Sequence, residues 1–361
     1  MKKLFVFLII INLLFLNSCK EDIELVGDFN ETAIVYGLLD QSDSIHYIKI
    51  NRAFIGPGNA LEFAQIPDSN YFENLEANIT EIINGNIIRT WELSDTLITD
   101  KDQNGVFYAP EQKVYYFNHS MNSPLDPNGN YNLEITINKG QANEFKITGQ
   151  TGLVNGMVSP QTNPSTSFSF IDNQGVLKAS SISLSNIGNA KIVNMSLLIN
   201  VDEISSNDTN HLEIPMNISD AEVSTSYSAS IQGQTFFELI QNNLTEDASI
   251  IKRKLTSVDV IVTGGSDDFL TYYSSSKPST SITQSKPIFT NLSTNSENNV
   301  LGIFTGRQTL KGKKLFSAPF QNFSCLDSKS REYLCTGTIT GNSLFCSDHQ
   351  LDVLKSFKCS N

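Results

Sequence analysis

The sequence predicts a mainly β protein with an N-terminal immunoglobulin-like sandwich, a larger β-rich domain with one or two helices, and a disulfide-stapled tail. Short runs of β-branched and aromatic residues alternate with turns of Asn, Gly, Asp and Ser, which is typical of consecutive strands. Several runs alternate apolar and polar residues with a period of two, as in strands buried on one face. Long stretches of Ala, Leu, Glu and Lys, which favour helices, are missing.

The first 30 residues predict an exported and lipidated N-terminus. Lys2 and Lys3 precede an apolar run, Leu4–Leu16, which is shorter than the roughly 20 residues of a membrane-spanning helix. This pattern indicates a signal peptide over 1–18. The run ends at Cys19 in a segment that resembles the bacterial lipobox, whose cysteine is lipidated and becomes the new N-terminus. An ordinary signal peptide with an incidental cysteine is the alternative.

Residues 19–30 predict a tether, and the residues directly after Cys19 predict a signal for export to the cell surface. Lys20, Glu21 and Asp22 resemble the export signal that sends lipoproteins of the Bacteroidota to the outer face of the outer membrane. The alternative is a solvated tether, in which charged residues are normal. We therefore expect a lipid-anchored outer-membrane protein that faces the cell exterior.

The immunoglobulin-like sandwich is predicted over 31–155. Its expected strands include Thr32–Asp40, His46–Phe54, Asn74–Gly85, Asn86–Ser94 and Asn130–Asn138. Asn84-Gly85-Asn86 predicts a hairpin turn between the third and fourth of these. In the last strand, Leu133, Ile135 and Ile137 alternate with polar residues and should face the core.

The second β-rich domain is predicted over 156–315, after a break at Asn155–Ser167 that is rich in Pro, Ser, Thr and Asn. A strong strand is expected at Ser257–Gly265. A helix is expected at Gln234–Asp247, with Thr235 as its cap. One apolar face of that helix would hold Phe236, Phe237, Ile240 and Leu244. A second short helix is expected at Asp267–Ser276.

The tail, 316–361, contains four cysteines, Cys325, Cys335, Cys346 and Cys359. An even number of cysteines in an exported protein predicts two disulfides. Three connectivities are possible, and the sequence does not choose between them. A zinc site is the alternative, but zinc sites use cysteine pairs of short spacing, and these four are widely spaced.

The composition excludes one class of partner. The formal net charge is −13, whereas a nucleic-acid-binding protein needs a basic face. The same overall charge argues against adhesion to anionic lipid headgroups by charge. Charged residues make up 17% and hydrophobic residues 39% of the 361 residues, so the chain can bury a core.

Three segments, taken in order, resemble a family of Bacteroidota outer-membrane lipoproteins of unknown function with an immunoglobulin-like N-terminal module. They are Glu31–Gly56, Asp126–Ile137 and Phe289–Arg307. Such proteins are commonly encoded near TonB-dependent receptors. The resemblance implies an accessory or binding subunit of an outer-membrane β-barrel complex, of the TonB-dependent transporter or barrel-assembly type. The chain departs from the family after about Leu310, where the tail begins.

The segment Asp100–Glu111 matches the spacing of a calcium loop. Hard oxygen ligands would come from the side chains of Asp100, Asp102 and Asn104, the carbonyl of Val106 and a bidentate Glu111. An EF-hand needs flanking helices, however, and the flanks here look like strands. A polar hairpin loop is therefore the alternative, and calcium is the only cofactor that the sequence suggests.

The sequence contains no nucleophile, zinc-protease or phosphate-loop motif, and we expect a binding protein and not an enzyme. The alternative is a stand-alone surface protein, either a carbohydrate-binding protein or an enzyme. Two loops, Ala53–Phe72 and Tyr272–Asn291, mix Gly or Pro with aromatic residues, which are enriched at interfaces. Phe54, Phe63, Phe72 and Phe289 are the candidate contacts. They could instead pack their own loops.

Overall fold

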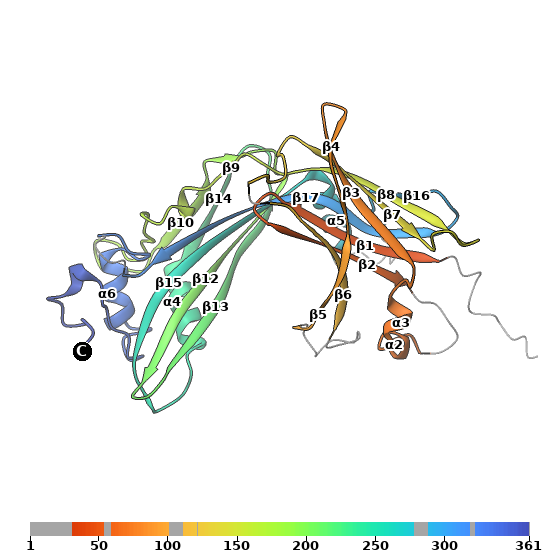
Figure 1. Cartoon of the computed structure of the whole chain (residues 1–361). Coiled ribbons are helices and arrows are strands. Elements are labelled where there is room, and N and C mark those ends of the chain that lie inside the picture. Colours follow the sequence, from red (N-terminus) through yellow and green to blue (C-terminus); the bar gives the residue numbers. More distant parts are fainter. Residues whose placement is uncertain are drawn as a thin grey trace, which may run out of the picture.

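A computed structural model describes residues 31–53, 59–100, 111–120, 122–277, 288–317 and 322–360. The fold is mainly β, as the sequence predicts, and the chain forms an arch with two legs (Figure 1). Each leg has its own buried apolar core. One continuous sheet runs through both legs, so the two halves are joined by paired strands and not only by a linker.

The continuous sheet has eight strands in the order β13-β12-β15-β17-β1-β2-β6-β5. They are β13 (Thr209–Glu222), β12 (Ile192–Ser205), β15 (Ile250–Gly265), β17 (Asn299–Leu315), β1 (Thr32–Asp40), β2 (Ile45–Ala53), β6 (Gln112–Asn118) and β5 (Ser94–Ile98). The first strand pair, β1 and β2, lies within a residue of its predicted bounds.

A second sheet of five strands completes the N-terminal sandwich. Its strands are β16 (Leu292–Thr294), β8 (Phe145–Gly152), β7 (Asn130–Ile137), β3 (Leu75–Ile83) and β4 (Asn86–Glu92), in that order. Leu133, Ile135 and Ile137 are buried in the core between the sheets, as their alternation predicts. The predicted hairpin turn is also present, since Asn84 and Gly85 both have positive φ, as a two-residue β-hairpin turn requires.

Tyr131, at the start of β7, gives this sandwich a feature of immunoglobulin-like folds. Its hydroxyl is fully buried and lies 2.9 Å from the carbonyl oxygen of Asp126, five residues upstream. This arrangement is a tyrosine corner. The same hydroxyl lies 2.7 Å from Oε1 of Glu81 on β3, so the corner is tied to the neighbouring strand as well.

Strand β17 belongs to both halves. Its first part, Asn299–Arg307, pairs in parallel with β1, and its second part, Arg307–Leu315, pairs antiparallel with β15. Gly302 has φ of +102°, and a Cβ there would lie 1.9 Å from the carbonyl oxygen of Val35, so only glycine fits at this contact. The N-terminal sandwich thus includes strands β16 and β17, which lie far beyond residue 155 in the sequence.

The C-terminal leg packs its sheet against a smaller layer of strands and helices. This layer holds β9 (Met157–Val158), η1 (Pro160–Thr162), β10 (Ala179–Leu184), β11 (Asn186–Ile187), β14 (Tyr227–Gln232) and α4 (Gly233–Asn242). Rings of Phe170, Phe236 and Phe237 contact one another in its core, with centroids 4.4 to 5.9 Å apart.

Both predicted helices form. Phe236, Phe237 and Ile240 of α4 are buried, and Leu244 packs partly against the same core. The predicted cap is wrong, because α4 begins two residues before Thr235, after Gln232, and no side chain caps it. The second helix, α5 (Asp267–Ser276), is capped by Ser266, whose hydroxyl accepts from the Phe269 N–H.

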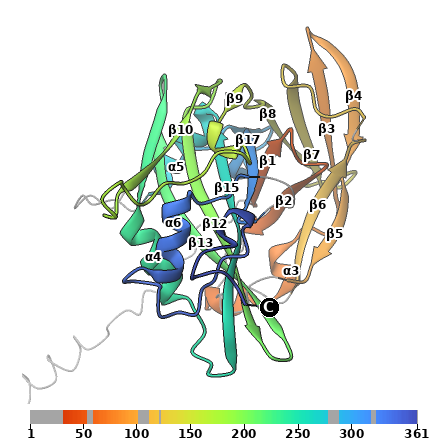
Figure 2. The same ribbon diagram turned by 90° about the vertical axis from the view of Figure 1, so that its left-hand side faces the viewer.

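Shorter helices complete the described chain: α2 (Ala60–Phe63), α3 (Pro67–Asn70), α6 (Ser328–Thr336) and η2 (Gln350–Asp352). In the tail, α6 lies beside α4 (Figure 2), and the rings of Tyr333 and Phe237 are 4.8 Å apart. Within the described residues, no helix combines the length and the apolarity needed to cross a membrane.

The tail contains one of the two predicted disulfides. It joins Cys346 to Cys359, whereas Cys325 and Cys335 are free thiols. The expectation that all four cysteines pair is therefore wrong for these two. Both thiols are buried in the core of the C-terminal leg, and burial raises the pKa of each to about 12. The reactive thiolate is thus scarce at neutral pH.

This burial predicts the pattern of thiol labelling. The folded protein should react with no more than a trace of a thiol reagent at Cys325 and Cys335, and the denatured, unreduced protein should react at both. Mass spectrometry of the labelled chain measures this directly. Label on Cys346 or Cys359 without reductant, or a bond between Cys325 and Cys335, would contradict the observed pairing.

Candidate binding face at the junction of the two halves

Helix α5 lies where the two halves meet, and glycine makes room for it. A Cβ at Gly265, the last residue of β15, would lie 2.5 Å from the Phe269 ring and 2.9 Å from the side chain of Ile192. Because Gly265 has no side chain, Phe269 can lie directly against the sheet. Ser266 then starts the helix, and its hydroxyl lies 2.5 Å from that of Thr305 on β17.

An apolar pocket of about 280 Å³ lies between α5 and the sheet. Its lining includes Leu38 of β1, Ile192 of β12, and Phe269 and Tyr273 of α5. Polar groups form its rim: the Tyr273 hydroxyl donates to Asp220 at 2.5 Å, and this hydrogen bond lowers the pKa of the Asp220 carboxyl. The site is a small apolar pocket, and the hydrogen-bonded Asp220 carboxylate lies at its rim.

A row of four tyrosines extends from this pocket across the outer face of the N-terminal sheet. Tyr272 of α5 donates to the Tyr36 hydroxyl at 3.0 Å, and their rings are 6.1 Å apart. Tyr36 lies opposite Lys49 on β2, and Tyr47, two residues from Lys49, lies opposite Tyr116 on β6. Since side chains two residues apart share a face, all of these lie on one face of the sheet.

Part of the tyrosine row is accessible to solvent. Tyr36 and Tyr47 are 37% and 47% exposed, although their strands are buried on the other face. Burial of part of Tyr36, together with its hydrogen bond from Tyr272, raises its pKa to about 12. The Tyr36 hydroxyl therefore stays neutral and can donate as well as accept at physiological pH.

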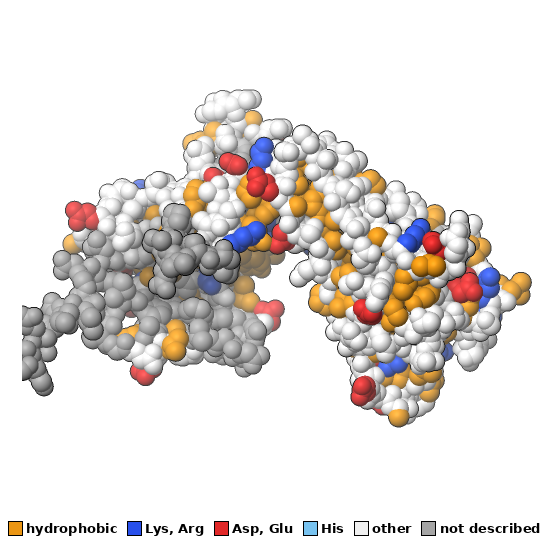
Figure 3. All heavy atoms as spheres, turned by 180° about the vertical axis from the view of Figure 1, so that it is seen from behind, with side chains coloured by type: hydrophobic (Ala, Val, Ile, Leu, Met, Phe, Trp, Pro, Cys, Tyr) orange, Lys and Arg blue, Asp and Glu red, His pale blue; other side chains and the backbone are white. Residues whose placement is uncertain are grey.

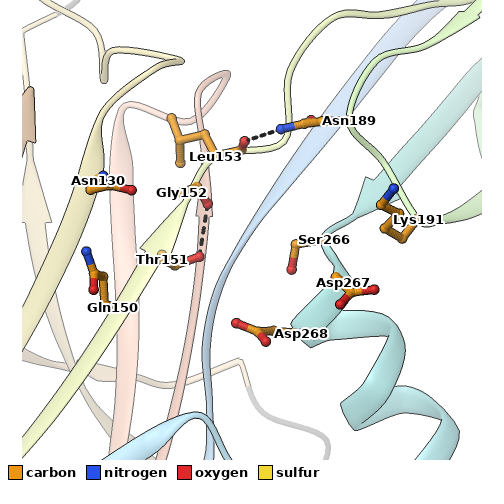
Figure 4. Close-up of a pocket in the computed structure, with 10 residues that line it drawn as sticks. All are labelled: Asn130, Gln150, Thr151, Gly152, Leu153, Asn189, Lys191, Ser266, Asp267 and Asp268. Carbon is orange, nitrogen blue, oxygen red and sulfur yellow. Dashed lines mark hydrogen bonds between the residues drawn. The ribbon is translucent and has the colours of Figure 1, made fainter. Parts of the chain in front are cut away.

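A polar cleft of about 420 Å³ lies at the N-terminal end of α5 (Figure 4). One wall is the end of β8 with Gln150 and Thr151, and Asp267 and Asp268 at the start of the helix lie across from it. The Asp268 carboxylate accepts from the Asn291 side chain at 2.9 Å. The cleft therefore offers hydrogen-bonding groups, whereas the pocket on the flank of the helix offers apolar ones.

Several predicted site residues lie outside the described part of the chain. These are Cys19, Lys20, Glu21, Asp22, Phe54, Asp102, Asn104 and Val106. The predictions of lipidation and export, and most of the calcium loop, therefore stay predictions.

The flanks of the calcium loop agree with the hairpin alternative. Strands β5 and β6 pair antiparallel with Ile98 opposite Gln112, so the segment between them connects a hairpin and has no flanking helices. Asp100 is exposed and Glu111 is half-buried. Across the described ranges, no three His, Cys, Asp or Glu side chains are placed to hold a metal together.

Three of the four predicted phenylalanines lie in the described part of the chain, and they do not form one exposed surface. Phe72 is buried in the core of the N-terminal sandwich, where its ring meets Phe145 edge-on, so it is not a surface contact. Phe63 and Phe289 are half-buried. In Figure 1, α2 and α3 of the first predicted loop lie well apart from α5, where the second begins.

The exposed Tyr36 and Tyr47 and the half-buried Tyr116 were missed as candidates, although part of the signal is in the sequence. Tyr47 and Lys49 alternate with Ile48 and Ile50, which places Tyr47 on the face away from the core. The alignment with Tyr116 and Tyr272 depends on pairing between distant segments, and no local pattern contains it.

Comparison with known proteins identifies no family. No protein-family model matches the chain, and a search of curated proteins also finds no match. Among solved structures, a match is the crystal structure of CBD12 from CALX1.2, with 8% sequence identity and a TM-score of 0.17. The match covers 78% of this chain and 99% of the other.

Proposed function

We propose that this protein is a surface-exposed, lipid-anchored subunit of the outer membrane that binds a β-barrel complex, either a TonB-dependent transporter or a barrel-assembly complex. The observation that carries the proposal is the N-terminal sequence, an apolar run that stops at Cys19 and is followed by Lys20, Glu21 and Asp22. The three segments that resemble outer-membrane lipoproteins support the same assignment.

The tyrosine row supports a role in binding. Tyr, Trp and Arg are the residues that most often contribute strongly to protein interfaces, because they bury a large area with few rotatable bonds. Here Tyr36, Tyr47, Tyr116 and Tyr272 line up across strands and are positioned by hydrogen bonds and ring contacts before any partner arrives. A face of this kind loses little entropy when it binds.

We expect the anchor and the tyrosine row to have separable effects in whole cells. Cys19→Ala should abolish acylation and release the protein from the outer membrane. Tyr36→Ser with Tyr47→Ser should keep the anchor but lower the amount of barrel protein that co-purifies at least tenfold, because two interface anchors are lost. Affinity purification after mild cross-linking and membrane solubilisation measures both.

Val176→Ser is the matched control, since Val176 is 58% exposed and lies in the other half of the protein. It should leave the complex intact. The assigned face would be refuted if no barrel protein co-purifies with the wild-type chain, or if the double tyrosine variant retains the whole complex. Acyl chains on the Cys19→Ala variant would refute the anchor.

A carbohydrate-binding surface protein is a second candidate, and the tyrosine row favours it too. Exposed aromatic rings can stack on sugar rings, and their hydroxyls can hydrogen-bond to them. Lys49 adds a donor on the same face. Glycan-array binding that is lost in the double tyrosine variant, without any barrel partner in cells, would favour this reading.

A further inference from the structure

The loop closed by the Cys346–Cys359 disulfide carries a cluster of exposed apolar side chains. Leu351, Val353 and Leu354 are 57%, 52% and 95% exposed. Single apolar residues are common on protein surfaces, but a cluster indicates a contact site. In Figure 1 the tail lies at the free end of the C-terminal leg, away from the junction.

The loop is held rigid from inside. Asp352, which lies between two of the apolar residues, is 2% exposed and accepts from Nε and Nη2 of Arg331 at 2.7 and 3.1 Å. The Ser347 hydroxyl also donates to it at 2.7 Å. The Ser347 N–H donates to the carbonyl of Phe357, and the Cys359 N–H donates to that of Ser347. These contacts hold the loop backbone in place, so the apolar side chains stay on the outside of the loop.

Three lysines lie within or next to the loop that carries the apolar tip. Lys355 and Lys358 are exposed within the loop, and Lys252 donates to the Ser360 carbonyl at 3.3 Å. The one exposed acid of the loop, Asp348, is paired with Lys254 at 3.1 Å. The local charge is therefore positive although the whole chain is acidic. At physiological salt, charges further away than about 8 Å are largely screened.

We infer that residues 347–358 form a second membrane-contact point, with the apolar tip at the acyl boundary and the lysines at anionic headgroups. Apolar side chains framed by lysines are typical of segments that lie in the membrane interface. A stable protein interface buries about 800 Å² on each partner, more than three projecting side chains supply. In Figure 3, hydrophobic side chains lie among both basic and acidic ones at the outer edge of this leg.

The inference rests on the proposed lipid anchor, which would hold the loop close to a membrane. It is tested with the chain from Lys20 to Asn361, which has neither the apolar signal peptide nor an acyl group and whose membrane binding can be measured without a barrel. The assay is flotation with phosphatidylcholine vesicles, with and without phosphatidylglycerol. The chain should float with the anionic vesicles and lose this binding as salt is raised, because salt screens the attraction between the lysines and the headgroups.

Leu354→Asn should weaken the binding about tenfold or more, because one buried leucine side chain is lost from the bilayer. Lys355→Glu with Lys358→Glu should weaken it by a similar factor at low salt. Ile87→Asn is the matched control, since Ile87 is 69% exposed on the distant β3–β4 hairpin, and it should bind unchanged. Urea unfolding checks that each variant is folded.

No flotation with anionic vesicles, or equal losses for Leu354→Asn and Ile87→Asn, would overturn the inference. If Leu354→Asn instead loses a protein partner in cells while vesicle binding never occurs, the loop is a protein contact and the membrane assignment is wrong. These outcomes are separate from the barrel complex, because a chain that fails to float could still co-purify with a barrel when it is acylated.

Discussion

Replacing Glu81 by alanine is expected to lower the free energy of unfolding by about 3 kcal/mol, because it breaks a buried ion pair and leaves its partners unpaired. Glu81 is fully buried and accepts from Nε and Nη2 of Arg89 at 2.5 and 2.7 Å. It also accepts from the Asp126 N–H at 3.0 Å and from the Tyr131 hydroxyl. The substitution therefore removes the acceptor that ties the tyrosine corner to β3.

Glu76→Ala is the matched control on the same strand. Glu76 also pairs with a basic residue, Lys139, but both side chains are more than half exposed, and such pairs contribute at most about 1 kcal/mol. Urea unfolding of the two variants measures the difference. Equal losses would show that the Glu81 network does not hold the sandwich together.

The same network gives a pH dependence with a definite sign. Burial alone would raise the pKa of Glu81, but the hydrogen bonds from Arg89, Asp126 and Tyr131 outweigh it and lower the pKa below its ordinary value of 4.5. A lowered pKa in the folded state stabilises the protein above the unfolded value. That part of the stability is lost as the pH falls below about 4.5, and it should be missing in Glu81→Gln.

His46→Phe is expected to remove the acid sensitivity of the N-terminal sandwich between about pH 6.5 and 4. The His46 ring is 1% exposed, and neither of its nitrogens has a hydrogen-bond partner among the described residues. It stacks on Phe117 with centroids 4.7 Å apart. A phenylalanine would keep this stacking and remove two buried polar atoms without partners.

The sign follows from the lowered pKa of His46. Burial and the nearby charges of His119 and Arg307 lower it from 6.5 to about 4, although Asp40 acts in the opposite direction. As the pH falls below 6.5, the unfolded chain binds a proton that the folded chain does not, so stability decreases until about pH 4. The full effect corresponds to about 3 kcal/mol, at 1.36 kcal/mol per pKa unit.

The measurement is the free energy of unfolding in urea at pH 7, 5.5 and 4.5. The wild-type protein should lose stability over this range, and His46→Phe should lose less. His211→Phe is the control, because His211 is largely exposed and pairs with Asp202 on the surface. If His46→Phe has the same pH profile as the wild type, the buried imidazole is not the source of the acid sensitivity.

Strands with strong local patterns could be predicted closely from the sequence. Strand β1 has the bounds that its apolar run predicts, and the β3–β4 turn occurs where Asn84-Gly85 requires it. Helix α6 was missed although its signals are present, since Asp327 caps it and Gly337 follows its end. Thr235 is not the cap because α4 starts two residues earlier, at Gly233, where a Cβ would lie 2.8 Å from the carbonyl oxygen of Lys178 and 2.9 Å from that of Phe170.

Features that depend on pairing between distant segments could not be predicted. No local signal says that β17 completes the first sandwich, or that only one pair of cysteines lies within bonding distance. The candidate face has the same origin. Alternation places Tyr47 on the outer surface, but only the sheet order brings it into line with Tyr36 and Tyr116.

The sharing of β17 sets the order in which the protein can mature. A chain that is synthesised from its N-terminus makes β1 early. The edge of β1 that pairs with β17 has no partner until β17 is made, since Thr32 pairs there with Asn299. Until then the growing molecule carries an open strand edge, and such edges recruit other chains and aggregate. Contacts this distant in sequence also slow folding. We therefore expect nascent or truncated products that stop before β17 to depend on holding chaperones, and the two legs to become protease-resistant together and late.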